Sequence, residues 1–92
     1  MGRRMEPQEA MGLALRTLRL ERGLSQAEVT DRADVARSWL SQMESGRSNP
    51  AWGSLIRLAG ALDVSPVELV ERAEQIRGGD WDVDPQPRRR SA

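Results

Sequence analysis

Residues 24–50 read LSQAEVTDRADVARSWLSQMESGRSNP, and this stretch decides the fold. Near its start, Ser25 and Glu28 form a capping box, in which each side chain accepts a hydrogen bond from the other residue's backbone N–H. The pair predicts a short helix that begins directly after Ser25 and ends near Ala33. Asp34 then serves as the turn residue, because Asp tolerates the left-handed backbone conformation.

A second short helix is expected from about Ala36 to Ser45, and Gly46 is a typical stop signal after it. Apolar residues recur in both helices and in the turn, at spacings that bring them together if the helices cross steeply: Val29, Ala33, Val35, Leu40 and Met43. The sequence therefore predicts two short helices, joined by a tight turn, that bury one shared apolar side.

The opposite side of the second helix is short, polar and nearly free of acid. At about 100° per residue it carries Ser38, Ser41, Gln42 and Ser45, with Arg37 on its flank. An ordinary solvated face usually carries Glu and Lys, which pair along the helix. Ser, Gln and Arg suit base edges instead, since Gln pairs with adenine, Arg with guanine and Ser with either. This face is a candidate for contact with DNA bases.

Further helix signals lie on both sides of this region. Residues 9–22 carry apolar residues at helical spacing and end at Gly23. Pro50 suits the first position of a fourth helix with Asn49 as its cap. That helix has an apolar stripe of Leu55, Leu58, Ala59 and Leu62. A fifth helix starts at the capping box of Ser65 and Glu68, carries Leu69, Val70 and Ala73, and ends before Gly78. The expected fold is all-α, a compact bundle of five helices.

Three segments are expected along the chain. Residues 1–8 are predicted to be a flexible N-terminal arm, and residues 9–77 the helical domain. Residues 78–92 combine an acidic stretch, two prolines and a basic end, which is typical of a disordered tail.

Composition excludes several classes of protein. The chain has 92 residues, no Cys and no His, and all 14 of its basic residues are Arg. Disulfide scaffolds, thiol catalysis, the usual metal sites and a Schiff-base lysine are therefore excluded, and no cofactor is expected. No apolar run approaches the roughly 20 residues of a membrane span, and the N-terminus is not a signal peptide. We expect a cytoplasmic protein that is not an enzyme.

The net charge of zero argues against a protein that coats nucleic acid indiscriminately. It leaves room for a domain with one basic face. Residues 1–24 carry five Arg and three Glu, whereas residues 63–77 carry four acidic residues and two Arg. A domain that binds DNA on one side could use this polarity.

The combined motifs resemble one family. Residues 23–29 (GLSQAEV) and 37–50 (RSWLSQMESGRSNP), followed by Leu55 to Leu62 and by Val64-Ser65-Pro66, are similar to the phage-repressor helix-turn-helix domains, also called the xenobiotic-response-element (XRE) family. The resemblance covers about residues 9–74. It implies a bundle of five helices in which the second and third form the helix-turn-helix, and the third lies in the major groove of DNA.

The resemblance also implies roles for particular residues. It places base contacts at Arg37, Ser38, Ser41 and Gln42. It places phosphate contacts at Gln26, Trp39, Arg47, Ser48 and Asn49. Arg19 and Glu44 match a partly buried ion pair between the first and third helices, which we interpret as structural. For any one base contact, the alternative is a contact with the DNA backbone or exposure to solvent. For Gln26 the alternative is an ordinary residue of the first helical turn, and for residues 47–49 it is a plain connecting loop.

Some positions depart from the family pattern. Asp34 replaces the usual turn glycine, and Thr30 replaces a small Ala where helices cross. Ala36 replaces the usual Ser or Thr cap, so the third helix is expected to start less firmly.

The tryptophans and Leu20 have separate interpretations. Trp52 is expected in the core, at the start of the fourth helix. Trp39 either packs over Met43 or lies against a sugar-phosphate. Leu20 joins Leu13 and Thr17 in a second apolar stripe on the first helix, which is either covered by an arm or tail of the chain or binds a protein. Trp81, in the tail, is either incidental or docks on another surface.

The sequence thus predicts a sequence-specific, DNA-binding transcription regulator. One recognition helix contacts few base pairs, so a homodimer on a palindromic operator is expected, with half-sites roughly 34 Å apart. Its dimer contacts would come from Ile56, Val64, Val67 and Val70 in the last two helices. The alternative is a protein-interaction module, such as an antitoxin or a regulatory subunit, whose partner binds through Leu20 or Trp81.

Overall fold

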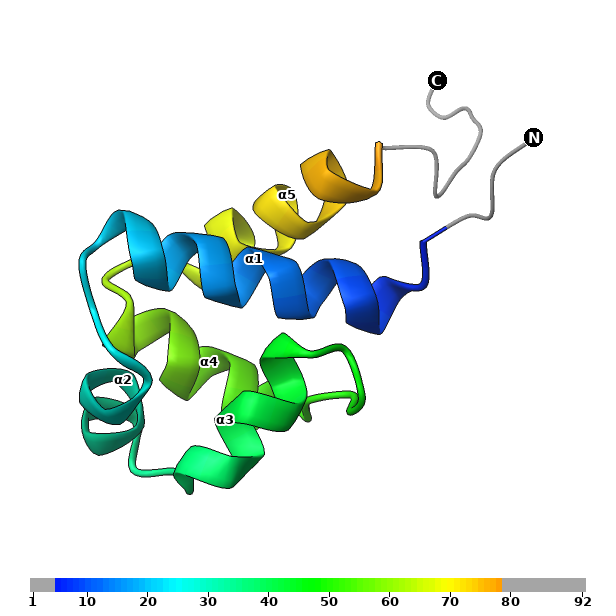
Figure 1. Ribbon diagram of the computed structural model, residues 1–92. Helices are drawn as coiled ribbons and strands as arrows, with labels where there is room; N and C mark the ends of the chain where they lie inside the picture. Colours follow the sequence, from blue (N-terminus) through cyan, green and yellow to red (C-terminus); the bar gives the residue numbers. More distant parts are fainter. Residues whose placement is uncertain (1–4, 79–92) are drawn as a thin grey trace.

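Helix signals along the chain produce five α-helices in the computed structural model, which describes residues 5–78 (Figure 1). The helices are α1 (Pro7–Glu21), α2 (Gln26–Ala33), α3 (Arg37–Glu44), α4 (Trp52–Ala61) and α5 (Pro66–Arg77). No strand occurs within residues 5–78. The prediction of an all-α, five-helix fold is confirmed.

Capping boxes fix the starts of α2 and α5. The Ser25 hydroxyl accepts a hydrogen bond from the N–H of Glu28 at 3.0 Å, and the Glu28 carboxylate accepts one from the N–H of Ser25 at 2.8 Å. Ser65 and Glu68 form the same pair at 3.1 and 2.8 Å. Each box satisfies backbone donors that a helix start leaves unpaired.

The start of α1 differs from the prediction. The helix begins at Pro7, so the last two residues of the expected arm, 7 and 8, are helical. The N–H of Glu6 donates to the Glu9 carboxylate at 2.9 Å, and proline is favoured at the first helical position. Glu6 is not a residue type that marks a helix start in sequence, which explains the shorter prediction.

The turns use left-handed backbone where it was expected. Asp34 has φ 57°, and Gly23, Gly46 and Gly78 have φ 67°, 80° and 97°. The Asp34 turn is closed by a hydrogen bond of 3.1 Å from the N–H of Val35 to the carbonyl of Thr30. Asp therefore takes the place of glycine in the helix-turn-helix without altering its course.

The predicted start of α4 is wrong. The N-cap residue is Ala51, which makes no side-chain cap, and the helix begins at Trp52 rather than at Pro50. Asn49 therefore does not cap the helix. Proline fixes φ near −65°, which suits extended backbone as well as a first helical turn, so Pro50 alone could not locate the start. The loop after α3 is longer as a result.

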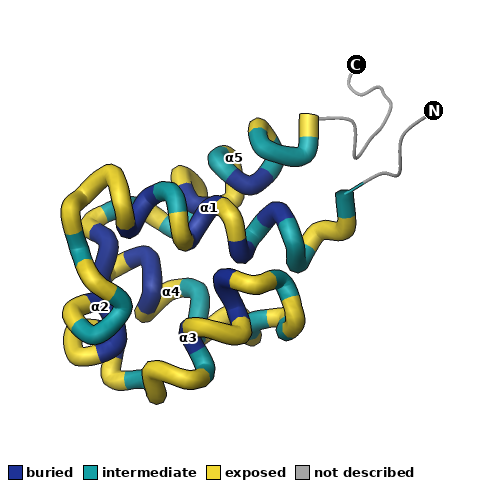
Figure 2. Tube along the Cα trace, in the orientation of Figure 1, coloured by how far each residue is buried: buried dark blue, intermediate teal, exposed yellow. Residues whose placement is uncertain are grey.

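The core is built from leucine and alanine. Figure 2 shows buried positions in every helix, and α1 packs against both α5 and α3, while α2 packs against α3 and α4. The largest fully buried side chains are Leu15, Leu40, Met43, Leu58, Leu62, Leu69 and Val29. The buried alanines are Ala10, Ala14, Ala33, Ala59, Ala61 and Ala73. Alanines let the helices approach closely, so a core without Phe or Tyr still closes.

One predicted core residue, Trp52, is on the surface, where it is 62% exposed. Val70, which was expected among the dimer contacts, is 42% exposed. Trp52 shares a face of α4 with Ile56, four residues on, which is also exposed. On α5 the inward positions are Leu69 and Ala73, and Val70 follows Leu69 by about 100° around the helix. Within residues 5–78, no other helix covers these side chains of α4 and α5.

Candidate nucleic-acid interface

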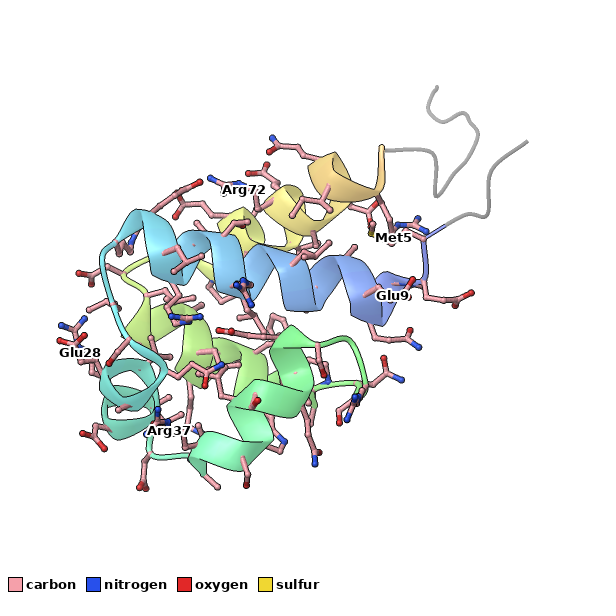
Figure 3. The ribbon with its side chains drawn as sticks, in the orientation of Figure 1. Met5, Glu9, Glu28, Arg37 and Arg72 are labelled. Carbon is pink, nitrogen blue, oxygen red and sulfur yellow. The ribbon has the colours of Figure 1, made fainter. Side chains whose placement is uncertain are left out.

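The outer face of α3 is exposed and polar. Its exposed side chains are those that the sequence assigned to DNA bases: Arg37, Ser38, Ser41 and Gln42. The inner side of the helix buries Leu40, Met43 and Glu44. Figure 3 shows Arg37 at the start of α3, on the side of the molecule away from α1. The only carboxylate on α3 is therefore turned inward, and the outer face carries no acidic side chain.

The residues that flank this face differ in their exposure to solvent. Arg47 and Asn49 in the loop after α3 are exposed, and Ser48 is half-buried. Trp39 is half-buried and packs against the core, which favours the first of its two interpretations. Part of its surface stays accessible beside the exposed residues of α3.

Gln26 lies at the first position of α2, and its side chain is already engaged. Its Nε2 donates to Oε1 of Glu44 at 3.1 Å. This hydrogen bond links the start of α2 to the last turn of α3. Its carboxamide is half-buried beside the end of α3.

A buried ion pair joins α1 to α3. Nε and Nη2 of Arg19 donate to the two carboxylate oxygens of Glu44 at 2.7 and 3.0 Å, a bidentate geometry. A third donor, Nη1 of Arg19, reaches the carbonyl of Leu24 at 3.0 Å. Arg19 is 8% exposed and Glu44 is 7% exposed. The hydrogen bond to Glu44 raises the pKa of Arg19 above its ordinary value. The expected pair is present.

These contacts hold the last turn of α3 from two directions. Glu44 receives hydrogen bonds from Arg19 of α1 and from Gln26 of α2. The start of α3 has no such support, because its N-cap Ala36 makes no side-chain hydrogen bond. Thr30, at the helix crossing, is accommodated by donating its hydroxyl to the carbonyls of Gln26 and Ala27.

Sequence reasoning missed one residue beside this site. Gly12 is buried within α1, and it touches the backbone of α3. A glycine inside a helix costs about 1 kcal/mol relative to alanine, so its position was a signal that pointed to a close contact.

Residues 5–78 contain no group of three or more His, Cys, Asp or Glu side chains that could hold a metal ion. Within the same range, no helix combines the length and the apolar character needed to cross a membrane. Trp81 and the predicted tail, like residues 1–4 of the predicted arm, lie outside the described residues.

Comparison with known proteins decides the family. The sequence pattern of the helix-turn-helix domain matches residues 10–73, which span all five helices. The chain belongs to the helix-turn-helix family. The resemblance that the motifs implied is thereby confirmed.

Relatives of this helix-turn-helix domain include regulators of transcription. An uncharacterized HTH-type transcriptional regulator of Sinorhizobium fredii, y4dJ, is 41% identical over 75 residues, which cover 82% of this chain and 97% of that protein. The immunity repressor protein of Bacillus phage phi105 is 33% identical over 67 residues, 73% of this chain and 46% of the repressor.

The fold is also shared with a solved structure. The clp gene regulator ClgR of Corynebacterium glutamicum superposes with a TM-score of 0.80 at 25% identity, over 86% of this chain and 84% of ClgR. The arrangement of the five helices is therefore that of a helix-turn-helix regulator.

Proposed function

We propose that this protein is a sequence-specific, double-stranded-DNA-binding regulator of transcription, which places α3 in the major groove. The observation that carries the proposal is the outer face of α3. It exposes Arg37, Ser38, Ser41 and Gln42, and the one acidic side chain of the helix is buried and paired. A face without carboxylates meets the negative potential of DNA without repulsion, and these residue types match base edges.

The surrounding residues have a different role in this proposal. Arg47, Ser48 and Asn49 in the loop after α3 would bind the phosphate backbone, with Gln26 and Trp39 at the margins of the contact. Phosphate contacts orient the protein on the duplex but carry no sequence information. Nε2 of Gln26 has two hydrogens, so its bond to Glu44 leaves one donor for a phosphate.

We propose that the working form is a homodimer on a palindromic operator. Exposed apolar side chains lie on the last two helices, and they are Trp52 and Ile56 on α4 and Val67 and Val70 on α5. Val64, expected among the dimer contacts, is half-buried and packs against the core. A self-complementary patch of this kind suits a two-fold interface. It would place the acidic residues of α5 away from phosphates.

The dimer is tested by sedimentation of two matched variants. Ile56→Glu puts a charge on α4 in the proposed interface, whereas Leu20→Glu puts the same charge on an exposed leucine of α1. We expect Ile56→Glu to sediment as a monomer and Leu20→Glu as the wild-type dimer. A monomeric wild-type chain at every accessible concentration would contradict the proposal.

Sequence-specific binding is tested by selection from a pool of randomised duplexes. We expect enrichment of an inverted repeat whose half-sites lie about 10 bp apart, centre to centre. Recovery of duplexes without a shared sequence would overturn the proposal, because it would mean that only phosphates are bound.

A second candidate function rests on α1. Leu13 and Leu20 are 38% and 54% exposed and lie seven residues apart, on the same side of the helix. A protein-interaction module, such as an antitoxin or a regulatory subunit, would use this stripe. It is favoured if Leu20→Glu abolishes function while Arg37→Ala and Gln42→Ala leave it intact. Neither candidate is an enzyme, and a regulator of transcription would act in the cytoplasm, where bacterial DNA lies.

A further inference from the structure

The backbones of α1 and α3 touch at Gly12. A Cβ atom added to Gly12 would overlap the carbonyl oxygen of Met43 and lie 2.9 Å from that of Glu44. Both atoms belong to the last turn of α3, and they are backbone, so no side-chain rotation can make room. Any larger residue at position 12 must therefore displace one helix from the other.

The same contact continues at the end of α3. Gly46 has φ 80°, and a Cβ there would lie 3.1 Å from Cα and 3.2 Å from Cγ of Glu9. Residues 9 to 12 of α1 thus lie directly against residues 43 to 46. About two turns further along α1, Arg19 binds the carboxylate of Glu44. We call the contact of residues 9–12 with residues 43–46 the α1–α3 seam.

The α1–α3 seam determines the position of the outer face of α3 relative to the rest of the domain. The helix is only eight residues long, and its start at Ala36 has no side-chain cap. Its direction is therefore set mainly where its last turn meets α1. Binding groups must be held within about 0.5 Å of their productive positions. A shift large enough to relieve a backbone overlap at Gly12 exceeds that tolerance.

We propose that Gly12 is a positioning residue for DNA recognition, which sets the placement of Arg37, Ser38, Ser41 and Gln42 without touching DNA. This inference rests on the proposed function. In the folded Gly12→Ala protein, α3 moves away from α1. Contacts to base edges depend on position and are lost, whereas attraction to phosphates is less directional and is largely kept.

The test compares Gly12→Ala with Gly53→Ala. Gly53 is also helical, but it is exposed and a Cβ there would meet nothing within 4 Å. Affinities are measured for the duplex selected above and for a random duplex, at a temperature where each variant is folded. We expect Gly12→Ala to lose about tenfold or more on the selected duplex and less than about threefold on the random one. Gly53→Ala should match the wild type on both, with unchanged sedimentation.

A role in stability alone predicts a different result. Fewer folded molecules would lower the affinity for both duplexes by the same factor. If Gly12→Ala does not fold alone, it is placed in the Gly53→Ala background, which adds helix propensity away from the seam. Amide chemical shifts give a second measure, with changes expected to concentrate in residues 40–46.

The outcomes separate the inference from the proposed function. A wild-type chain that binds the two duplexes equally overturns the proposed function. A wild-type preference that a folded Gly12→Ala retains overturns the positioning role alone. A chain that stays unfolded in both backgrounds also overturns it, because Gly12 is then a requirement for folding rather than for the placement of α3.

Discussion

The two ends of α3 are supported very differently. At its last turn, Glu44 is buried and receives hydrogen bonds from Arg19 and Gln26, and Gly12 brings the backbone of α1 into direct contact. At its first turn, Ala36 provides no cap, Arg37 is exposed, and no acidic side chain favours the helix dipole. By contrast, α2 and α5 both begin with complete capping boxes.

This difference shows how a small bundle can hold a recognition helix firmly at one end and leave its other end accessible. The anchored end fixes the position of α3 through buried contacts with α1 and α2. The open end lacks a side-chain cap and leaves the side chains of Arg37 and Ser38 exposed to a ligand, at a cost in helix stability. Changes at the anchored end should therefore alter both the stability of the fold and the placement of the outer face, whereas changes to the exposed side chains of that face should alter DNA binding with little effect on stability.

The largest expected effect comes from breaking the anchored end. Arg19→Met leaves the Glu44 carboxylate buried without its bidentate partner, and we expect the free energy of unfolding to fall by about 3–5 kcal/mol. Urea denaturation followed by circular dichroism measures the change. The double variant Arg19→Met, Glu44→Met removes both charges and should recover much of the loss. An Arg19→Met protein within about 1 kcal/mol of the wild type would show that the pair does not hold α3.

At the open face, Gln42→Ala should weaken the selected duplex by about 1–3 kcal/mol and relax the preference at one base pair. Its effect on unfolding should be small, because the side chain is exposed. The matched variant Arg47→Ala should weaken selected and random duplexes alike and reduce the salt slope by about 1. Equal losses on both duplexes for Gln42→Ala would rule out contact with a base.

The uncapped start can be strengthened. Ala36→Ser offers a hydroxyl that can accept a hydrogen bond from an N–H of the first turn, and we expect it to raise the free energy of unfolding by about 1 kcal/mol. Ser25→Ala removes the hydroxyl that caps α2 at present and should lower it by a similar amount. Thermal or urea unfolding of both variants tests the comparison. No gain from Ala36→Ser would mean that the first turn is already satisfied by other contacts.

The smallest effect concerns pH. Hydrogen bonds from the backbone N–H and the hydroxyl of Ser25 lower the pKa of Glu28 below its ordinary value of 4.5. A lowered folded pKa stabilises the protein above pH 4.5, and this contribution is lost as the pH falls through the folded value. Glu28→Gln cannot titrate, so its stability should fall less steeply below pH 4.5. Superimposable acid-unfolding curves for the two proteins would contradict this account.

Local signals predicted much of the fold. Ser25 with Glu28 located α2 and Asp34 was assigned its turn, because these features depend only on neighbouring residues. The weak start at Ala36 followed from the departure from the family pattern. The start of α4 could not be predicted in this way, because the φ angle of Pro50 suits both extended backbone and a first helical turn. The exposure of Trp52 depends on whether another helix covers it, and that is a property of the whole bundle.

Parts of the candidate site could also be predicted from the sequence. The exposed side of α3 followed from helical periodicity, and the pair of Arg19 and Glu44 followed from the family resemblance. Gly12 was missed because a glycine inside a helix does not reveal which element approaches it, and the helical glycines Gly53 and Gly60 have no such neighbour. The contact joins residues that lie far apart in sequence, so its geometry emerges only in the folded chain.

The outer face of α3 is proposed to recognise a DNA sequence. The most direct test is fluorescence-anisotropy binding of the full chain to the duplex selected from the randomised pool and to a random duplex, over about 50 to 200 mM salt. We predict salt-sensitive binding to both and a preference for the selected duplex of about 1,000-fold or more. Equal affinity for the two duplexes at every salt concentration, for a folded dimer, would contradict the account.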